Sequence, residues 1–212
     1  MEYQYYPNQN QYDCPRSSNN SIFIPEPKCN FVKKYNYLSI DSRDRDRTSY
    51  PNPNSYRIPF NPVEGTSGSL GKVYKNVIEI SLVSVLVPNI ATIENKQYII
   101  LEIDELKNLM FSSSTEALKY GFAKLHFHTP STGCAYMDVD NSTPLTYTFY
   151  QSPIATLSSL TVRYKEYNGN LINFGVDTSP PDPCTDAIQN SLTFKVVESV
   201  ANVDSLQQFN VY

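Results

Sequence analysis

Apolar and polar residues alternate along most of this chain in short runs, and turn-forming residues separate one run from the next. A period of two places the apolar residues of each run on one face of a β-strand. Such runs predict about nine strands, at residues 37–40, 56–60, 77–88, 97–104, 122–128, 146–150, 158–167, 171–174 and 191–199. At most one short helix is expected, within residues 111–120, where Ser113 or Ser114 could cap it. Many short strands with so little helix indicate an all-β protein.

Eight main strands in two antiparallel sheets predict a β-sandwich of the single jelly-roll type. An immunoglobulin-like sandwich is the alternative, although the chain has no Trp and no suitable Cys pair. The most specific turn is Asn168-Gly169, because both residues accept a positive φ, and it should join the strand at 158–167 to the strand at 171–174.

The alternation also predicts which side chains form the core. Within residues 77–88, Ile78, Ile80, Leu82 and Leu86 should face the opposite sheet. The other face of this strand is apolar as well, so we expect it to be covered too. Four residues on four different strands serve as markers of the predicted core: Leu82, Leu125, Leu160 and Phe194.

The composition changes near residue 30. Residues 1–30 are a low-complexity segment rich in Gln, Asn, Tyr, Ser and Pro, with too few aliphatic residues to build a core. We expect an extended N-terminal arm at 1–30, a jelly-roll domain at 31–200 and a C-terminal tail at 201–212. The arm could be disordered, or it could become ordered on a neighbouring subunit, in which case the apolar residues Ile22 and Phe23 would dock.

A charged segment, Arg43-Asp44-Arg45-Asp46-Arg47, follows the strand expected at 37–40. A calcium loop is disfavoured because the arginines neutralise the acidic side chains and no Gly follows. A solvated loop is the plain alternative, with exposed ion pairs that contribute roughly 0–1 kcal/mol each. The functional alternative is a subunit contact in which Arg side chains bind carboxylates of a neighbour. The candidate interface residues are Arg43, Asp44, Arg45, Asp46, Arg47 and Tyr50, and we expect the fold not to need the segment Arg43–Arg47.

Several classes of function are disfavoured. A net charge of −4 and a pI near 5.2, with Lys33-Lys34 as the one basic cluster, argue against direct nucleic-acid binding. No apolar stretch is long enough for a transmembrane helix. His126 and His128 share a strand face but have no nearby Cys, and the four cysteines lack metal-binding spacing, so we expect no metal and no cofactor. No nucleophile motif supports catalysis, and we expect the protein not to be an enzyme.

Three blocks of this sequence resemble a family of single jelly-roll penton and minor capsid proteins of large icosahedral double-stranded DNA viruses, the nucleocytoplasmic large DNA viruses. The first block is YLSIDSRDRDRTSYPNPNSYRIPF at 37–60, the second is KNVIEISLVS at 75–84 with Val87-Pro88-Asn89, and the third spans 153–175. The loop after Phe174 departs from the family pattern, because Asp177-Thr178-Ser179-Pro180-Pro181 replaces its usual stretch.

The resemblance implies a structural virion protein, either a capsid penton at the vertex or a minor capsid component. Its partners would be copies of itself, with a pentamer as one option, and other capsid proteins. Its location would be the virion, after assembly in the host cytoplasm. The resemblance also favours the subunit-contact interpretation of the charged segment. A carbohydrate- or receptor-binding jelly-roll module on the virion surface is the alternative, because tyrosine-rich loops can bind sugars.

Overall fold

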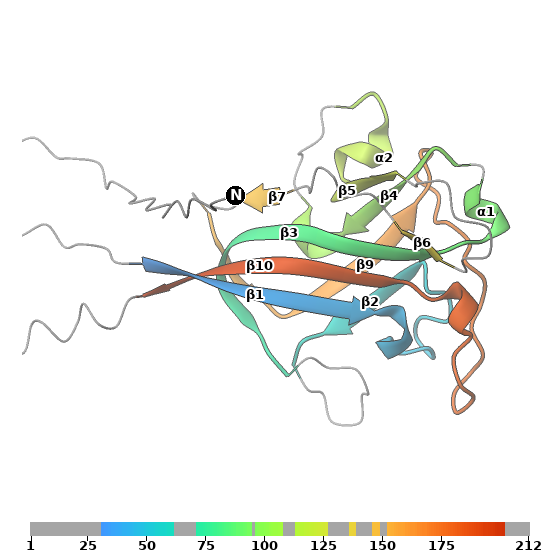
Figure 1. Ribbon diagram of the computed structural model, residues 1–212, viewed down its shortest axis with the longest axis horizontal. Coiled ribbons are helices and arrows are strands. Elements are labelled where there is room, and N and C mark those ends of the chain that lie inside the picture. The colour runs from blue at the N-terminus through green and yellow to red at the C-terminus, as the bar shows by residue number, and fades with distance from the viewer. Residues whose placement is uncertain are drawn as a thin grey trace, which may run out of the picture.

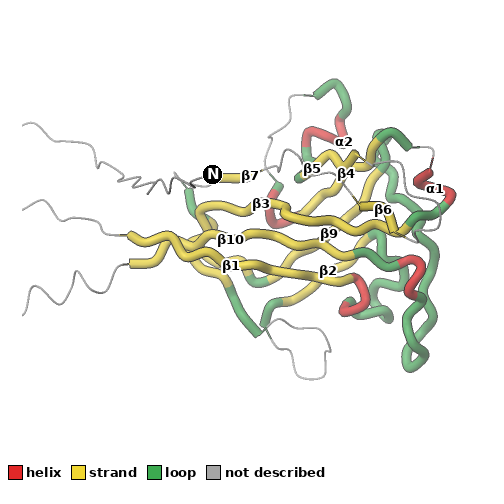
Figure 2. Tube along the Cα trace, in the orientation of Figure 1, coloured by secondary structure: helices red, strands yellow, loops and turns green. Residues whose placement is uncertain are grey.

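The computed structural model describes residues 31–61, 71–94, 96–107, 113–126, 136–138, 146–148 and 152–201, and these form two packed antiparallel sheets (Figure 1). The strands are β1 (Phe31–Asp41), β2 (Ser55–Pro59), β3 (Tyr74–Pro88), β4 (Tyr98–Ile103), β5 (Ala123–His126), β6 (Tyr136–Asp138), β7 (Thr146–Thr148), β8 (Ile154–Leu157), β9 (Ser159–Lys165) and β10 (Ser191–Ala201). The helical turns are short: α1 (Ala91–Glu94), α2 (Glu116–Lys119), and the 3-10 turns η1 (Ser42–Asp44), η2 (Asp104–Leu106) and η3 (Asp186–Ile188). Strands therefore dominate the described chain, as Figure 2 shows, and the all-β prediction is confirmed.

The strand order is that of a jelly roll. One sheet runs β1-β10-β3, and β6, β7 and β8 each pair with a different part of β3 on its other side. These three short strands together fill one strand position, so this sheet has four positions. The other sheet runs β2-β9-β4-β5. Eight strand positions in two four-position sheets match the jelly-roll count, and the predicted fold class is confirmed.

The core lies between the two sheets. In β9, Leu160, Val162 and Tyr164 are all fully buried, as the period of two predicts, and so are the alternate residues of β2. The Phe122 and Phe194 rings meet edge to face with centroids 5.9 Å apart, a favourable aromatic geometry. All four marker residues are buried, at 2% exposure or less: Leu82, Leu125, Leu160 and Phe194.

Strand β3 departs from the predicted alternation at two β-bulges. Its pairing with β10 leaves out Ile78 and Val83. At the first bulge Val197 faces Glu79 and the next residue, Glu198, faces Val77. At the second bulge Thr193 faces Ser84 and Phe194 faces Leu82. Each extra residue shifts the side-chain phase by one. The inward residues are consequently Val77, Ile80, Leu82, Val85 and Val87.

The prediction that Leu86 faces the core is therefore wrong, since it lies after the second bulge and is 41% exposed. Val83 is similarly exposed at 44%. The apolar residues on two sides of β3 thus reflect a change of phase along one strand, and the outer face at Val83 and Leu86 is open in the described structure.

The local turn predictions have mixed outcomes. Asn168-Gly169 forms the expected turn with Gly169 at φ +88°, but the expected strand at 171–174 reduces to a single bridge between Leu171 and Lys165. The N-cap of helix α2 is Thr115, not Ser113 or Ser114 as expected, and Ser113 Oγ, two residues before the cap, accepts a hydrogen bond from the Thr115 backbone N–H.

Strand β1 starts at Phe31, and its pairing with β10 ends at Ala201. The expected domain limits, at residues 31 and 200, stay a prediction. The expected arm at 1–30, with Ile22 and Phe23, and residues 202–212 of the expected tail lie outside the described residues. Of the helices in the described ranges, none has the length and apolar character needed to span a membrane.

Candidate functional site

The charged segment between β1 and β2 folds back on itself instead of continuing the strand. Asp41 ends β1 and accepts a hydrogen bond from the Arg43 backbone N–H at 2.9 Å, which caps η1. Farther along, Asp46 Oδ1 accepts from the Thr48 N–H at 3.0 Å, and Asp46 Oδ2 accepts from Ser49 Oγ at 2.6 Å. The acidic residues of the segment thus shape a turn, and no alternating charged faces form.

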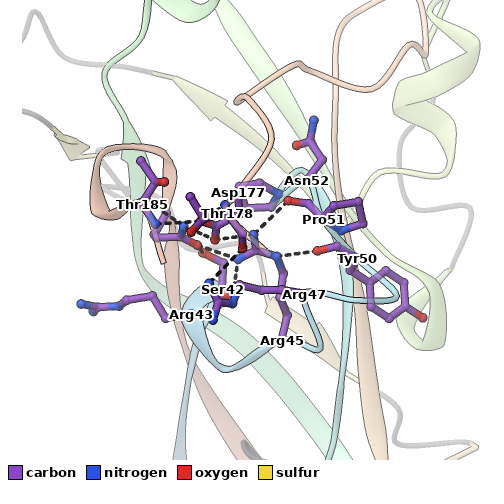
Figure 3. A network of polar contacts seen from close by, with 12 residues as sticks. Ser42, Arg43, Arg45, Arg47, Tyr50, Pro51, Asn52, Asp177, Thr178 and Thr185 are labelled. Atoms are coloured by element: carbon purple, nitrogen blue, oxygen red, sulfur yellow. Dashed lines mark hydrogen bonds and ion pairs between the residues drawn. The ribbon is translucent and has the colours of Figure 1, made fainter. Parts of the chain in front are cut away.

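Arg45 points into the protein and makes five hydrogen bonds there (Figure 3). Its Nη2 lies 2.8 Å from Asp177 Oδ2, and the two side chains are completely inaccessible to solvent. The remaining acceptors are Gln189 Oε1 and three backbone carbonyls, those of Ser42, Tyr50 and Pro51. A guanidinium carries five N–H donors, so this environment can satisfy the whole group.

Asp177 is equally well satisfied. Its Oδ1 accepts from the backbone N–H of Thr178 at 2.9 Å and of Thr185 at 2.7 Å. Its Oδ2 accepts from Gln189 Nε2 at 2.9 Å as well as from Arg45. Burial alone would raise the pKa of Asp177, but the hydrogen bonds from Thr185, Gln189, Arg45 and Thr178 outweigh burial and hold the pKa below its ordinary 3.8.

The network continues into the core through Asn190. Ser42 Oγ donates to Gln189 Oε1 and accepts from the Asn190 N–H, both at 2.8 Å. Asn190 Oδ1 accepts from the hydroxyl groups of Tyr56, at 2.8 Å, and Tyr164, at 3.0 Å. Burial raises the pKa of both phenols, so both remain neutral donors. We call the end of the sandwich built by Ser42, Arg45, Asp177, Gln189 and Asn190 the locked end.

The locked end joins two connections that are far apart in sequence, the β1–β2 connection and the loop that precedes β10. The sequence pattern did not identify Asp177, Gln189 or Asn190. No local signal marks them, because their partners in the β1–β2 connection are distant in sequence: Asp177 is 132 positions from Arg45 and Asn190 is 148 from Ser42.

The structure corrects the interpretation of Arg45. As a surface contact residue that the fold does not need, Arg45 should be exposed, but it is buried at the centre of the locked end. The physical reason is that the 3-10 turn η1 reverses the chain and aims this one arginine inward. Arg45 is therefore a structural residue.

The other candidate residues lie around the rim of the locked end. Arg43 is half exposed and pairs with Asp41 at 2.7 Å, with Asp186 at 3.8 Å beyond it. Arg47 donates to the carbonyl groups of Thr178 and Asp182, at 3.1 and 2.7 Å. Asp44 and Asp46 are exposed, whereas Tyr50 is partly buried and packs on the core. Their role at a subunit contact stays a prediction.

The remaining sequence candidates do not converge on a reactive centre. His126 is exposed at the end of β5, and His128 lies outside the described residues. Cys184 is a free thiol in the loop before β10. Within the described ranges, no group of three His, Cys, Asp or Glu side chains could hold a metal ion.

The fold and the locked end together define a single jelly-roll protein braced by a buried polar network. No protein-family model matches the chain. It is 24% identical over 136 residues to the penton capsid protein P1 of Paramecium bursaria Chlorella virus 1, and the matched segment covers 64% of this chain and 73% of that protein. It is also 25% identical over 179 residues to an uncharacterized protein of Acanthamoeba polyphaga mimivirus, and this match covers 67% of this chain and 60% of that protein.

The chain thus spans less than two thirds of the mimivirus protein. These two similarities make the chain a distant homologue of both viral proteins. They support a capsid-protein family of the nucleocytoplasmic large DNA viruses, which is the resemblance that the sequence blocks carry.

Proposed function

We propose that this chain is a structural component of the capsid of a large icosahedral double-stranded DNA virus, and that it acts by assembly. The observation that carries the proposal is the jelly-roll strand order combined with homology over 136 residues to a penton capsid protein. Jelly rolls recur in viral capsids, where burial of surface between subunits provides the stabilisation. The named relative is a structural capsid protein, which implies a non-enzymatic role.

We further infer a vertex position, with copies in a closed ring of five. A closed ring requires each subunit to offer two different faces. Two surfaces of the described residues fit this need: the exposed aromatic side of β1 and the charged rim of the locked end, with Arg43, Asp44 and Asp46. Because the network beneath the rim is already fixed, the rim would lose little conformational entropy on binding. A minor capsid position beneath the shell is the competing location.

The partners in this proposal are other copies of the chain and other capsid proteins. The location is the virion, following assembly in the host cytoplasm. None of these contacts requires nucleic acid, which agrees with the net charge of −4.

The test is to locate the chain in intact particles by cryo-electron microscopy, with an antibody fragment bound to the tagged protein. Extra density at the five-fold vertices is the expected result. Density confined to the inner side of the shell would rule out the vertex position and indicate a minor capsid protein beneath the shell. Absence of the chain from washed capsids would overturn the structural role itself.

A further inference from the structure

The outer edge of β1 is an unusually apolar strand edge. Among the described strands β1 pairs only with β10, so it forms the edge of its sheet. It is 11 residues long and carries large exposed side chains: Phe31 at 64%, Val32 at 51%, Tyr35 at 59% and Tyr37 at 72% exposure. A long edge with such side chains is a template for pairing with another strand, which natural proteins normally cover or blunt.

The exposed aromatic residues share one side of the strand. The register with β10 is regular over the whole of β1, so Phe31, Tyr35 and Tyr37 project away from the core while Leu38 and Ile40 project into it. Tyr35 is also held in place, because the Lys195 Nζ lies 5.9 Å from its ring centroid and 3.0 Å from Glu79. This side of β1 therefore presents three exposed aromatic side chains, with Lys33 between Phe31 and Tyr35, and we call the three the aromatic row.

The chain that precedes β1 enters at this same place. Phe31 pairs with Ala201, and Figure 1 shows the first part of β1 and the last part of β10 projecting together beyond the other labelled strands. Residues 1–30 contain one apolar, strand-forming stretch, Ile22-Phe23-Ile24. The apolar character of this stretch matches that of the exposed aromatic side chains on β1.

The residues between this stretch and β1 favour a partner in another copy. Pro25 and Pro27 favour extended conformations at Ile24 and Glu26, so the sequence favours a stiff spacer of four residues here. Three residues, Lys28, Cys29 and Asn30, would remain to reverse the chain onto its own strand. A stiff spacer followed by so short a reversal favours pairing of Ile22–Ile24 with another subunit over pairing with their own β1.

We propose that residues 22–24 of one copy add as a strand to the exposed edge of β1 in a second copy of the same chain. Main-chain hydrogen bonds would provide affinity, and the aromatic row would select the apolar stretch. Such an exchange is heterologous, so it can close into a ring. The inference deepens the proposed function by naming the partner, but its test uses purified protein and does not depend on the virion.

The test is disulfide trapping between copies of the full chain, with Cys14, Cys29, Cys134 and Cys184 replaced by Ser. One preparation carries Phe23→Cys, and a second, mass-tagged preparation carries Tyr35→Cys or, to allow for register, Tyr37→Cys. The two are mixed and oxidised, and mass spectrometry counts the tagged–untagged pairs. The matched control is Tyr167→Cys, a tyrosine exposed at 66% just before the Asn168-Gly169 turn.

We expect at least about tenfold more mixed pairs with Tyr35→Cys or Tyr37→Cys than with Tyr167→Cys, because docking raises the effective concentration of the two thiols towards millimolar. Yields equal to the control at both positions would overturn the proposal. So would a crosslink that forms only within one chain in a Phe23→Cys/Tyr35→Cys double variant, because the arm would then cover its own subunit. Circular dichroism of each variant verifies the fold. A strong crosslink in a protein that is absent from capsids would leave this inference standing and remove the proposed function.

Discussion

Arg45 and Asp177 form an ion pair that is completely removed from solvent, with Arg45 Nη2 2.8 Å from Asp177 Oδ2. One residue comes from the connection after β1 and the other from the loop before β10. Taking two charges out of water is costly, so the pair itself adds little net stability, but removing one partner leaves an uncompensated buried charge. The locked end therefore depends on both residues of the pair being present.

The first prediction compares two arginines of the same segment. Arg45→Met should lower the free energy of unfolding by about 3–5 kcal/mol, because Asp177 would remain buried and unpaired. Arg43→Met is the matched control, since the Arg43 side chain is 53% exposed, and it should cost no more than about 1 kcal/mol. Urea unfolding of the full chain measures both. Equal losses for the two variants would mean that Arg45 is not held as described.

The second prediction concerns the pH dependence of stability. The pKa of Asp177 is lower in the folded chain than its ordinary 3.8, so its ionisation stabilises the folded state above that pH. The contribution is lost as the pH falls from 3.8 through the lower, folded pKa. Wild type should therefore be more stable than Asp177→Asn at neutral pH, and the difference should shrink in acid below pH 3.8. A difference that stays constant through this range would contradict the assignment.

The third prediction tests the two bulges of β3. Leu82→Ala should cost about 2–5 kcal/mol, as for other large-to-small changes in a core. Leu86→Ala removes the same atoms four residues later but should change stability by no more than about 0.5 kcal/mol, because Leu86 is on the outer face. Thermal or urea melts distinguish the two. A large loss at Leu86 would show that the alternation continues unbroken along β3.

The alternation of apolar residues predicted most of the strands because burial on one face is a local, periodic property. Tyr56 and Ile58 in β2 and Leu160 and Val162 in β9 follow it without interruption. In β3 the alternation could not predict the phase, because a bulge is set by how the strand pairs with β10. Nothing in Leu82-Val83-Ser84 marks the extra residue.

The candidate site was predicted only in part, for a related reason. The alternating charges of Arg43–Arg47 are typical of a solvated or contact surface, and this description fits Arg43. Whether Arg45 points inward depends on Asp177 and Gln189, which the fold brings to it from more than 130 positions away. A local pattern carries no information about such distant partners.

The fourth prediction tests the rim of the locked end as a subunit contact. Arg43→Glu should leave the melting curve of the purified chain almost unchanged, because its pair with Asp41 is exposed. If Arg43 meets a neighbour's carboxylate, the reversal should weaken assembly by about 2–5 kcal/mol and reduce incorporation into particles. The control is Arg57→Glu, the same change at an exposed residue of β2. Normal incorporation of Arg43→Glu would mean that the rim faces solvent and does not contact another subunit.

A structural capsid role can be tested by counting the copies of this chain in purified, washed virions, with quantitative mass spectrometry against the major capsid protein. A structural component should be present in a fixed ratio that survives salt washing, and a vertex ring should give a low copy number in multiples of five per vertex. Absence of the chain, or a trace amount that varies between preparations and washes away, would rule out a structural role in the capsid.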